Sequence, residues 1–366
     1  MIIKEKQQNS NLTYFLYFIL TLLIILLIYF LNKNKKKTLK SENEFAEEKI
    51  LNLDESENYY TAKLDEKPPF KIDLVFTWAG EKKSRDIRTN YNGELQYSLR
   101  AAVENLPWIN KIYILMNEKK IPSWFKNNYS KLITLIGHEE VFDAKNLPNI
   151  NSNAIEMSIS NIEGLSEHFI YFNDDIFVSR KLPYTEFFTR SGKAINIEKV
   201  LNTVQLESEI LKFKLPKVVN GFHLHIPIVF LKSEIINFEN KYPEYVNWVR
   251  STKIRKFEGG DICRKNKISS VPCQQLQGAV LPLQLENGKS VIKESAISEK
   301  CGWNGSSFYV NSNCMKKLKY LYNLKKKGKK LPKSFAVQES FPNPNNAKII
   351  KKYLPLIFDK KPFYEK

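Results

Sequence analysis

Apolar residues between positions 71 and 172 recur in two spacings, one typical of strands and one typical of helices. Mostly apolar runs predict strands over residues 72–78, 111–116, 132–136 and 168–172. Apolar residues at helical spacing predict helices over 94–106 and 153–162. This alternation predicts an α/β fold with a Rossmann-like, mostly parallel sheet and helices on both faces.

The most apolar stretch of the chain is residues 12–31, which contain no charged residue, Gly or Pro. As a helix, these residues would be about 30 Å long, the thickness of the hydrocarbon core of a bilayer. The stretch is longer than the apolar part of most signal peptides and shows no small-residue cleavage site. We therefore expect a short tail (1–11), a single-pass transmembrane anchor (12–31) in a lipid bilayer, a charged stem (32–70) and a folded domain (71–366).

The composition gives 57 Lys+Arg against 39 Asp+Glu and a formal net charge of +18. Two lysine runs, over residues 33–40 and 316–333, supply 14 of these charges. Few aromatic residues accompany the second run, so a stacking platform for nucleic acid is not indicated and we expect no nucleic-acid partner. The first run favours a cytoplasmic domain by the positive-inside rule, whereas the order of anchor, stem and domain favours a Golgi-type lumenal domain.

The four cysteines, Cys263, Cys273, Cys301 and Cys314, all lie in the last third of the chain. They allow two disulfide bonds in any of three pairings, as expected in an oxidising lumen. Four free thiols in a reducing compartment are an equally ordinary interpretation.

Polar residues directly follow the predicted strands, including Trp78-Ala79-Gly80, Gly137-His138 and Asn173-Asp174-Asp175. In an open parallel sheet, ligands bind beyond the carboxyl ends of the strands, so these residues are expected to converge. Two adjacent carboxylates at such an edge offer the hard oxygen ligands that suit Mg²⁺ or Mn²⁺. No glycine-rich dinucleotide motif and no phosphate-binding GxxxxGK[ST] loop is present.

Each of these local signals has a structural alternative. Asn173 to Asp175 also fit a turn stabilised by Asn and Asp side chains. Asn153 and Glu156 fit a helix cap followed by Glu at the third position. His223 and His225 would lie on one face of a strand, yet no further His or Cys lies close enough in sequence to favour zinc.

Taken together, several segments form an ordered set of motifs, namely 72–78, 92–100, 107–109, 121–124, 151–156, 169–175, 225–227 with Thr252, Arg255 and Asp261, and 331–335. This set resembles the Stealth family. The family comprises the capsular polysaccharide phosphotransferases and the catalytic subunit of lysosomal-enzyme N-acetylglucosamine-1-phosphotransferase. The resemblance extends from Lys71 to the end of the chain.

The resemblance implies transfer of a sugar-1-phosphate from a nucleotide sugar, such as UDP-N-acetylglucosamine, to a hydroxyl of a glycan or glycoprotein acceptor. It implies that Asp174 and Asp175 bind Mg²⁺ or Mn²⁺, that Arg255 stabilises the transferring phosphoryl group, and that His225 is the general base, with His138 as a second candidate. The substrate-binding residues it implies are Asp73, Trp78, Asn92, Glu94, Arg100, His138, Asn151, Asn153, Glu156, Asn173 and Asp261.

Two other functions fit the same residues. A metal-dependent glycosyltransferase would use a similar acid pair and the same donors but break the bond at the anomeric carbon. A non-catalytic, glycan-binding relative is suggested by departures from the family pattern at Ala79–Glu81, Thr89–Tyr91 and Gln338-Glu339.

Overall fold

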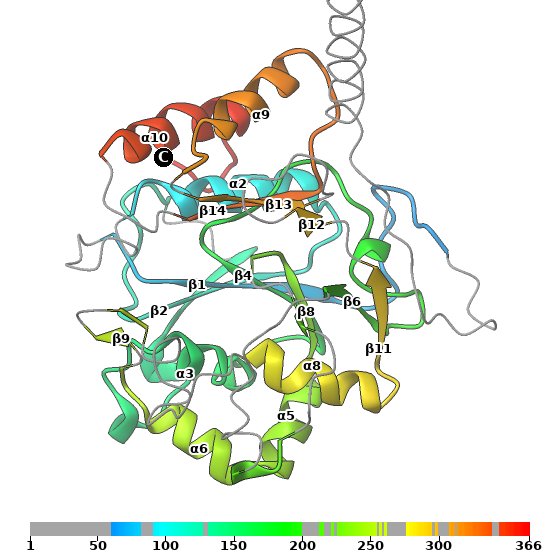
Figure 1. Ribbon diagram of the computed structural model, residues 1–366, viewed down its shortest axis with the longest axis vertical. Helices are drawn as coiled ribbons and strands as arrows, with labels where there is room; N and C mark the ends of the chain where they lie inside the picture. Colours follow the sequence, from blue (N-terminus) through cyan, green and yellow to red (C-terminus); the bar gives the residue numbers. More distant parts are fainter. Residues whose placement is uncertain are drawn as a thin grey trace, which may run out of the picture. The chain divides into compact units, whose positions relative to one another are not determined.

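The computed structural model of the chain is shown in Figure 1. It describes residues 60–81, 91–126, 131–199, 212–215, 221–222, 225–254, 256–257, 260–261, 276–294, 297–298, 307–311, 313–338 and 344–366. The predicted tail, the predicted anchor and most of the predicted stem lie outside these ranges. Within the last part of the predicted stem, Ala62 is buried and its amide donates a hydrogen bond to Thr185 Oγ1 (3.1 Å).

The central sheet has five strands in the order β3-β2-β1-β4-β8. Its members are β1 (Ile72–Trp78), β2 (Ile112–Met116), β3 (Ile133–Gly137), β4 (His168–Asn173) and β8 (Ile228–Leu231). The first four are parallel to their neighbours, whereas β8 pairs antiparallel with β4. In β1 and β2 nearly every side chain is buried, as expected for strands covered on both faces.

Three smaller sheets surround the central one. They are β12-β13-β14-β5, β11-β6-β7 and β10-β9. Their strands are β5 (Ile176–Val178), β6 (Ala194–Lys199), β7 (Gly221–Phe222), β9 (Lys256–Phe257), β10 (Gly260–Asp261), β11 (Ser290–Glu294), β12 (Ile297–Ser298), β13 (Ser307–Asn311) and β14 (Ser334–Gln338). The chain therefore leaves the central sheet at the end of β4 and enters a second sheet at β5, after only Asp174 and Asp175.

Helices cover both faces of the central sheet (Figure 1). On one face lies α2 (Glu94–Asn105), with α9 (Lys317–Lys326) and α10 (Pro344–Ile357) beyond it. On the other lie α3 (Ser152–Glu156), α5 (Lys232–Lys241), α6 (Pro243–Ser251) and α8 (Leu276–Glu286). Each face has its own core: Leu95 and Leu99 of α2 belong to the first, and Phe238 and Val249 of α5 and α6 to the second. Burying such side chains contributes about 1.5–3 kcal/mol each.

The predicted fold class needs correction. The sheets are mixed, because β8 is antiparallel in the central sheet and β5 and β7 are antiparallel in the smaller ones. Among the helices of the described ranges, none combines the length and apolar character needed to span a bilayer. The structure is thus a mixed α/β fold, and the transmembrane helix included in the predicted fold class is not supported.

The predicted helix over 153–162 is also wrong in its extent. It divides into α3 and the short 3₁₀ helix η4 (Ile159–Asn161). Ser158 Oγ donates a hydrogen bond to the Ala154 carbonyl (2.9 Å), a back-bond that bends helices. Asn151, and not Asn153, caps α3, since its side chain accepts a hydrogen bond from the Asn153 amide (3.1 Å).

A buried ion pair joins α2 to the end of the chain. Arg100 Nε and Nη2 donate to the two carboxylate oxygens of Glu365, and Nη1 donates to the Phe358 carbonyl (3.0 Å). The Glu365 side chain is only 1% exposed. Gln96 Nε2 donates to the same carboxylate (2.7 Å). Arg100, which was predicted to bind substrate, is thus engaged in a structural ion pair.

We predict that Arg100→Met lowers the free energy of unfolding by about 3–5 kcal/mol, because it leaves the Glu365 carboxylate buried without its partner. Urea unfolding followed by circular dichroism measures the change. Lys360→Met is the matched control, since its pair with Glu104 is exposed, and we expect it to cost less than about 1 kcal/mol. Equal losses in the two variants would contradict a stabilising role for the Arg100–Glu365 pair.

Candidate functional site

The candidate site lies at the carboxyl edge of the central sheet, where β1 and β4 end side by side. Thr77 of β1 pairs with Asn173 of β4, so Trp78 and Asp174 follow at the same edge. Because β8 is antiparallel to β4, Ile228 at its start pairs with Tyr171 near the end of β4. His225, three residues before β8, therefore comes to this edge as well.

Tyr171 links the elements that meet there. Its hydroxyl lies 2.9 Å from Thr77 Oγ1, 2.7 Å from Asn173 Oδ1 and 3.4 Å from Glu156 Oε1. The other carboxylate oxygen of Glu156 accepts a hydrogen bond from the Leu276 amide at the start of α8 (3.4 Å). Two predicted substrate-binding residues, Asn173 and Glu156, are thus held in one network.

Three carboxylates interact electrostatically beyond the end of β4. Burial, and then repulsion from Asp175 and Glu94, raises the pKa of Asp174 well above its usual value. Burial, and then repulsion from Glu94, raises the pKa of Asp175 to about 7. Such shifts in a cluster of acids at a strand end are typical of functional sites.

Glu94 reaches this cluster from the first turn of α2. The preceding residue, Gly93, has a φ of 102°, a left-handed conformation that a residue with a Cβ rarely adopts. The Glu94 side chain accepts hydrogen bonds from the amide and the side chain of Asn92 (2.5 and 3.2 Å). These contacts hold the carboxylate that raises the pKa values of Asp174 and Asp175.

Two buried polar atoms at this edge have no hydrogen-bond partner among the described residues. They are Asp175 Oδ1, an acceptor, and Trp78 Nε1, a donor. The Trp78 indole packs edge-on against Tyr91, with 5.3 Å between ring centroids. An unsatisfied buried polar atom is costly, so a ligand that supplies the missing partners would be favoured here.

The acid pair fits a hard divalent cation. Mg²⁺ is commonly held by one or two carboxylates, with substrate phosphates and waters completing its coordination. Asp174 and Asp175 supply two carboxylates, and a cation would also relieve the repulsion that raises their pKa values. Within the part of the chain that the structure describes, no group of three or more His, Cys, Asp or Glu side chains is arranged to hold a metal ion.

Other predicted site residues are buried, and several of them make structural contacts. Asp73, near the amino end of β1, accepts hydrogen bonds from Asn110 Nδ2 (2.7 Å) and the Ser166 amide (2.8 Å). Asn151 caps α3 and donates to the Thr252 carbonyl (2.9 Å), and Asn153 is fully buried. His138 is 3% exposed, and burial lowers its pKa to about 4, which makes it a weak base. Arg255 and the side chain of Asp261 lie outside what the structure describes.

The sequence analysis missed Thr77, Tyr91 and Tyr171. A detectable signal existed for Tyr171, because residues two apart on a strand share a face and Tyr171 precedes Asn173 by two. For Tyr91, the sequence contained only a weak indication that the residue belongs to the site. Burial raises the pKa of its hydroxyl, with smaller contributions from Glu94, Glu81 and Asp174, which places it close to the acids.

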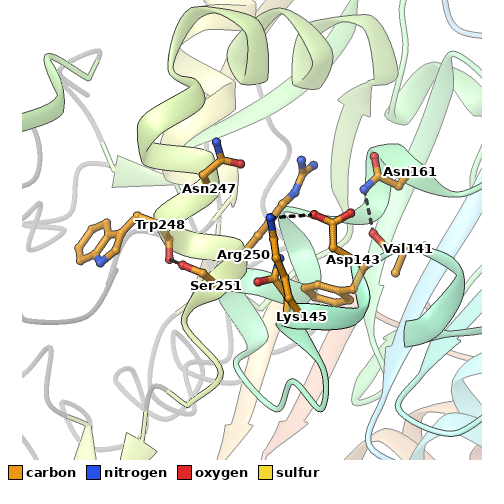
Figure 2. A pocket seen from close by; sticks show the side chains of 10 residues that line it. Val141, Asp143, Lys145, Asn161, Asn247, Trp248, Arg250 and Ser251 are labelled. Carbon is orange, nitrogen blue, oxygen red and sulfur yellow. Dashed lines mark hydrogen bonds and ion pairs between the residues drawn. The ribbon is translucent and has the colours of Figure 1, made fainter.

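A separate cavity of about 400 Å³ lies between η3 (Ala144–Asn146) and α6, and Figure 2 shows its lining. Most polar groups there are engaged with protein atoms: Arg250 Nη2 donates to the Met157 carbonyl (2.7 Å) and pairs with Glu239 (2.6 Å). Asn161 donates to the Val141 carbonyl (2.8 Å), and Lys145 lies 3.8 Å from Asp143. None of the predicted site residues lines this cavity.

Comparison with known proteins identifies the region that carries the site. Residues 88–196 match the family model described as Stealth protein CR2, conserved region 2. The chain is 39% identical over 147 residues to capsular polysaccharide phosphotransferase LcbA of Neisseria meningitidis, covering 34% of this chain and 40% of that protein. It is 35% identical over 187 residues to a capsular polysaccharide phosphotransferase of Actinobacillus suis, covering 44% and 50%. The resemblance seen in the sequence is thereby confirmed.

These matches span half or less of the relatives' own length. Among solved structures, galactosyltransferase LgtC in complex with donor and acceptor sugar analogues aligns with 80% of this chain and 98% of that chain. The TM-score is 0.42 and the sequence identity 11%, a likeness too weak to bear on function.

We predict that the contribution of Asp175 to the stability of the metal-free protein falls as the pH rises from about 4 to about 7. In that window the Asp175 carboxyl, with a pKa of about 7, binds more protons in the folded protein than in the unfolded chain, where an Asp titrates near 3.9. Asp175→Asn removes this effect, so the variant should have a higher free energy of unfolding than the wild type at pH 8. The expected difference is about 1.4 kcal/mol for each tenfold difference in the proton affinity of Asp175 between the folded and unfolded states.

Urea titrations in EDTA at pH 5 and pH 8 measure the difference. Asp143→Asn, at a carboxyl whose side chain is 73% exposed, is the control and should change stability by less than about 0.5 kcal/mol at both values. An Asp175→Asn variant that is less stable than the wild type at pH 8 would show that the carboxylate is satisfied in the folded protein.

Proposed function

We propose that the chain transfers a sugar-1-phosphate from a nucleotide sugar to a glycan hydroxyl, forming a phosphodiester, because its residues 88–196 match conserved region 2 of the Stealth family. The observation that carries the proposal is the acid pair at the end of β4, inside the matched region, where Asp175 Oδ1 is buried without a partner among the described residues. A divalent cation on a pyrophosphate is the ligand that best suits such a pair.

The reaction requires attack at phosphorus, not at carbon. The acceptor oxygen forms a bond to the phosphorus that bears the sugar, the bond from that phosphorus to the bridging oxygen breaks, and a nucleoside monophosphate leaves. Enzymes achieve such transfers mainly by positioning the groups and neutralising charge. Asp174 and Asp175 would hold Mg²⁺ or Mn²⁺, which would neutralise charge on the pyrophosphate.

The chain's own residues at this edge suit the remaining tasks. His225 is the proposed general base, which accepts the proton of the attacking acceptor hydroxyl. Trp78 Nε1, a donor without a partner among the described residues, would hydrogen-bond to an oxygen of the nucleotide sugar. Asn173 and Glu156, held by Tyr171, would orient the hydroxyls of the donor sugar.

The disulfide bond of Cys314 supports an oxidising compartment for this domain. Of the two interpretations of the cysteines, bridges therefore fit better than four free thiols. A Golgi-type lumenal location for this domain remains our proposal. Protease protection in sealed membrane vesicles would test it.

We predict that a donor labelled in its sugar-linked phosphate transfers the label into the glycan product. The assay incubates the purified chain with Mg²⁺, labelled UDP-N-acetylglucosamine and a panel of oligosaccharide acceptors, and separates product from nucleotide. Release of labelled UDP with an unlabelled product would identify a metal-dependent glycosyltransferase instead. Glycan binding without any nucleotide release, across a panel of nucleotide sugars, would identify a non-catalytic relative.

We also predict that Asp175→Asn lowers turnover by about 10²–10³-fold, because it removes a carboxylate that holds the cation. The urea titrations described above establish independently that the variant is folded. Asp143→Asn, beside the separate cavity, should keep wild-type turnover. Activity of Asp175→Asn within a few-fold of the wild type would rule out its role at the metal.

A further inference from the structure

The C-terminal helices form a strongly basic surface, which we call the α9–α10 surface. Residues 313–338 and 344–366 contain fifteen lysines and two acids, Asp359 and Glu365. Both acids are in ion pairs, Asp359 with Lys325 (2.6 Å) and Glu365 with Arg100. The positive charge of the exposed lysines is thus not balanced by acids of the same segments.

Most lysines lie on the outer faces of the two helices, whereas Lys317 is buried. In α9 the buried side chains include Leu318, Leu321 and Leu324, whereas Lys319 and Lys326 are exposed. In α10 the buried side chains include Ile350 and Leu354, and the exposed lysines are Lys348, Lys351 and Lys352. The turn after α9 adds the exposed residues Lys327 and Lys330. The two helices lie side by side (Figure 1), with Tyr322 and Tyr353 in ring contact (6.0 Å). Their exposed lysines are therefore close neighbours.

One strand connects this surface to the acid pair. The Ser179 amide donates to the Lys333 carbonyl (3.0 Å), just before β14. Four residues further on, the Val337 amide donates to the Asp175 carbonyl (2.9 Å). At about 3.3 Å per residue, Lys333 and Asp175 are separated by roughly 13 Å along the strand. Lys333 itself is paired with Glu186, and the exposed Lys330 of the α9–α10 surface precedes it by three residues, at most about 11 Å further along the chain. The basic surface therefore lies within a few sugar lengths of the proposed reaction centre.

We propose that the α9–α10 surface binds an anionic glycan chain, the phosphodiester-containing product of the proposed reaction. This inference rests on the proposed function, since each transfer adds one negatively charged phosphodiester to the acceptor. A polymer made in this way carries repeated charges that flexible lysines can follow without a fixed geometry. Retention of the growing chain on this surface would keep its end near Asp175 for the next transfer.

The surface fits this partner better than a bilayer or a nucleic acid. Helices that lie on membranes present a face rich in large apolar residues, but the apolar faces of α9 and α10 are used in the protein core. Among the described residues after position 312, the exposed large apolar side chains are Leu356 and Phe363. A stacking platform of several exposed aromatic rings, which single-stranded nucleic acid would require, is not present in this part of the described structure.

The test compares two charge variants of the full chain that lose the same number of exposed lysines. The first replaces Lys319, Lys326, Lys327 and Lys330 with Gln. The matched control replaces Lys63, Lys67, Lys111 and Lys131, which are exposed elsewhere. Fluorescence anisotropy measures binding to phosphorylated dextran, with neutral dextran of equal length, vesicles containing phosphatidylserine and single-stranded DNA as alternative probes.

We expect the first variant to bind phosphorylated dextran at least tenfold more weakly than the control variant. The slope of log binding constant against log salt concentration should become shallower by about 0.7 for each lysine involved in binding. Equal affinities of the two variants, or tighter binding to vesicles or DNA than to phosphorylated dextran, would overturn the proposal. Turnover with a short neutral acceptor should be unchanged in both variants. If the labelled-donor assay shows no transfer but the α9–α10 surface still binds phosphorylated dextran, the proposed function is refuted and the binding surface is not. If transfer occurs but the two variants bind phosphorylated dextran equally well, only the proposed binding surface is refuted.

Discussion

The structure depends on the constraint that two adjacent carboxylates occupy a two-residue connection between two sheets. Asn173 is fixed by its pairing with Thr77 in the central sheet, and the Asp175 carbonyl is fixed by the Val337 amide of β14. The backbone of the connection is therefore held from both sides, and the acids cannot separate to relieve their repulsion. Burial and Glu94 add to the cost, as the raised pKa values of both acids show. Unfavourable electrostatics of this kind persist where a ligand supplies the compensating charge.

Charges elsewhere in the fold are compensated within the protein. Glu186 is also largely buried, yet Lys293 (2.8 Å) and Lys333 (2.7 Å) donate to it, and together they lower its pKa against the effect of burial. Glu365 is paired with Arg100 in the same way. Glu186 and Asp175 are both buried, but Glu186 has lysine partners whereas Asp175 Oδ1 has no partner among the described residues. This difference distinguishes a structural acid from a candidate ligand-binding acid better than burial alone does.

The sequence predicted the local structure well and the long-range structure poorly. The expected strand over 72–78 is β1 to the residue, because its apolar run reflects burial on both faces. The pairing of β5 with β14 joins residues more than 150 positions apart, and no local pattern specifies it. The same reason explains why the ion pair of Arg100 was not predicted, since its partner Glu365 lies 265 residues away. At the site, the acid pair was visible in the sequence, whereas the Tyr171 network required the register of β1 and β4.

The main error in the predicted fold bears directly on the proposed mechanism. A strand parallel to β4 at the position of β8 would have the residues that precede it at the amino edge of the sheet, opposite the acid pair. Because β8 runs antiparallel to β4, the chain enters β8 from the carboxyl edge, with Ile228 beside Tyr171. This reversal brings His225 to the edge that carries Asn173, Asp174 and Asp175. The proposed general base and the proposed cation-binding acid pair, 50 residues apart in sequence, thus come to the same edge only because β8 is antiparallel to β4.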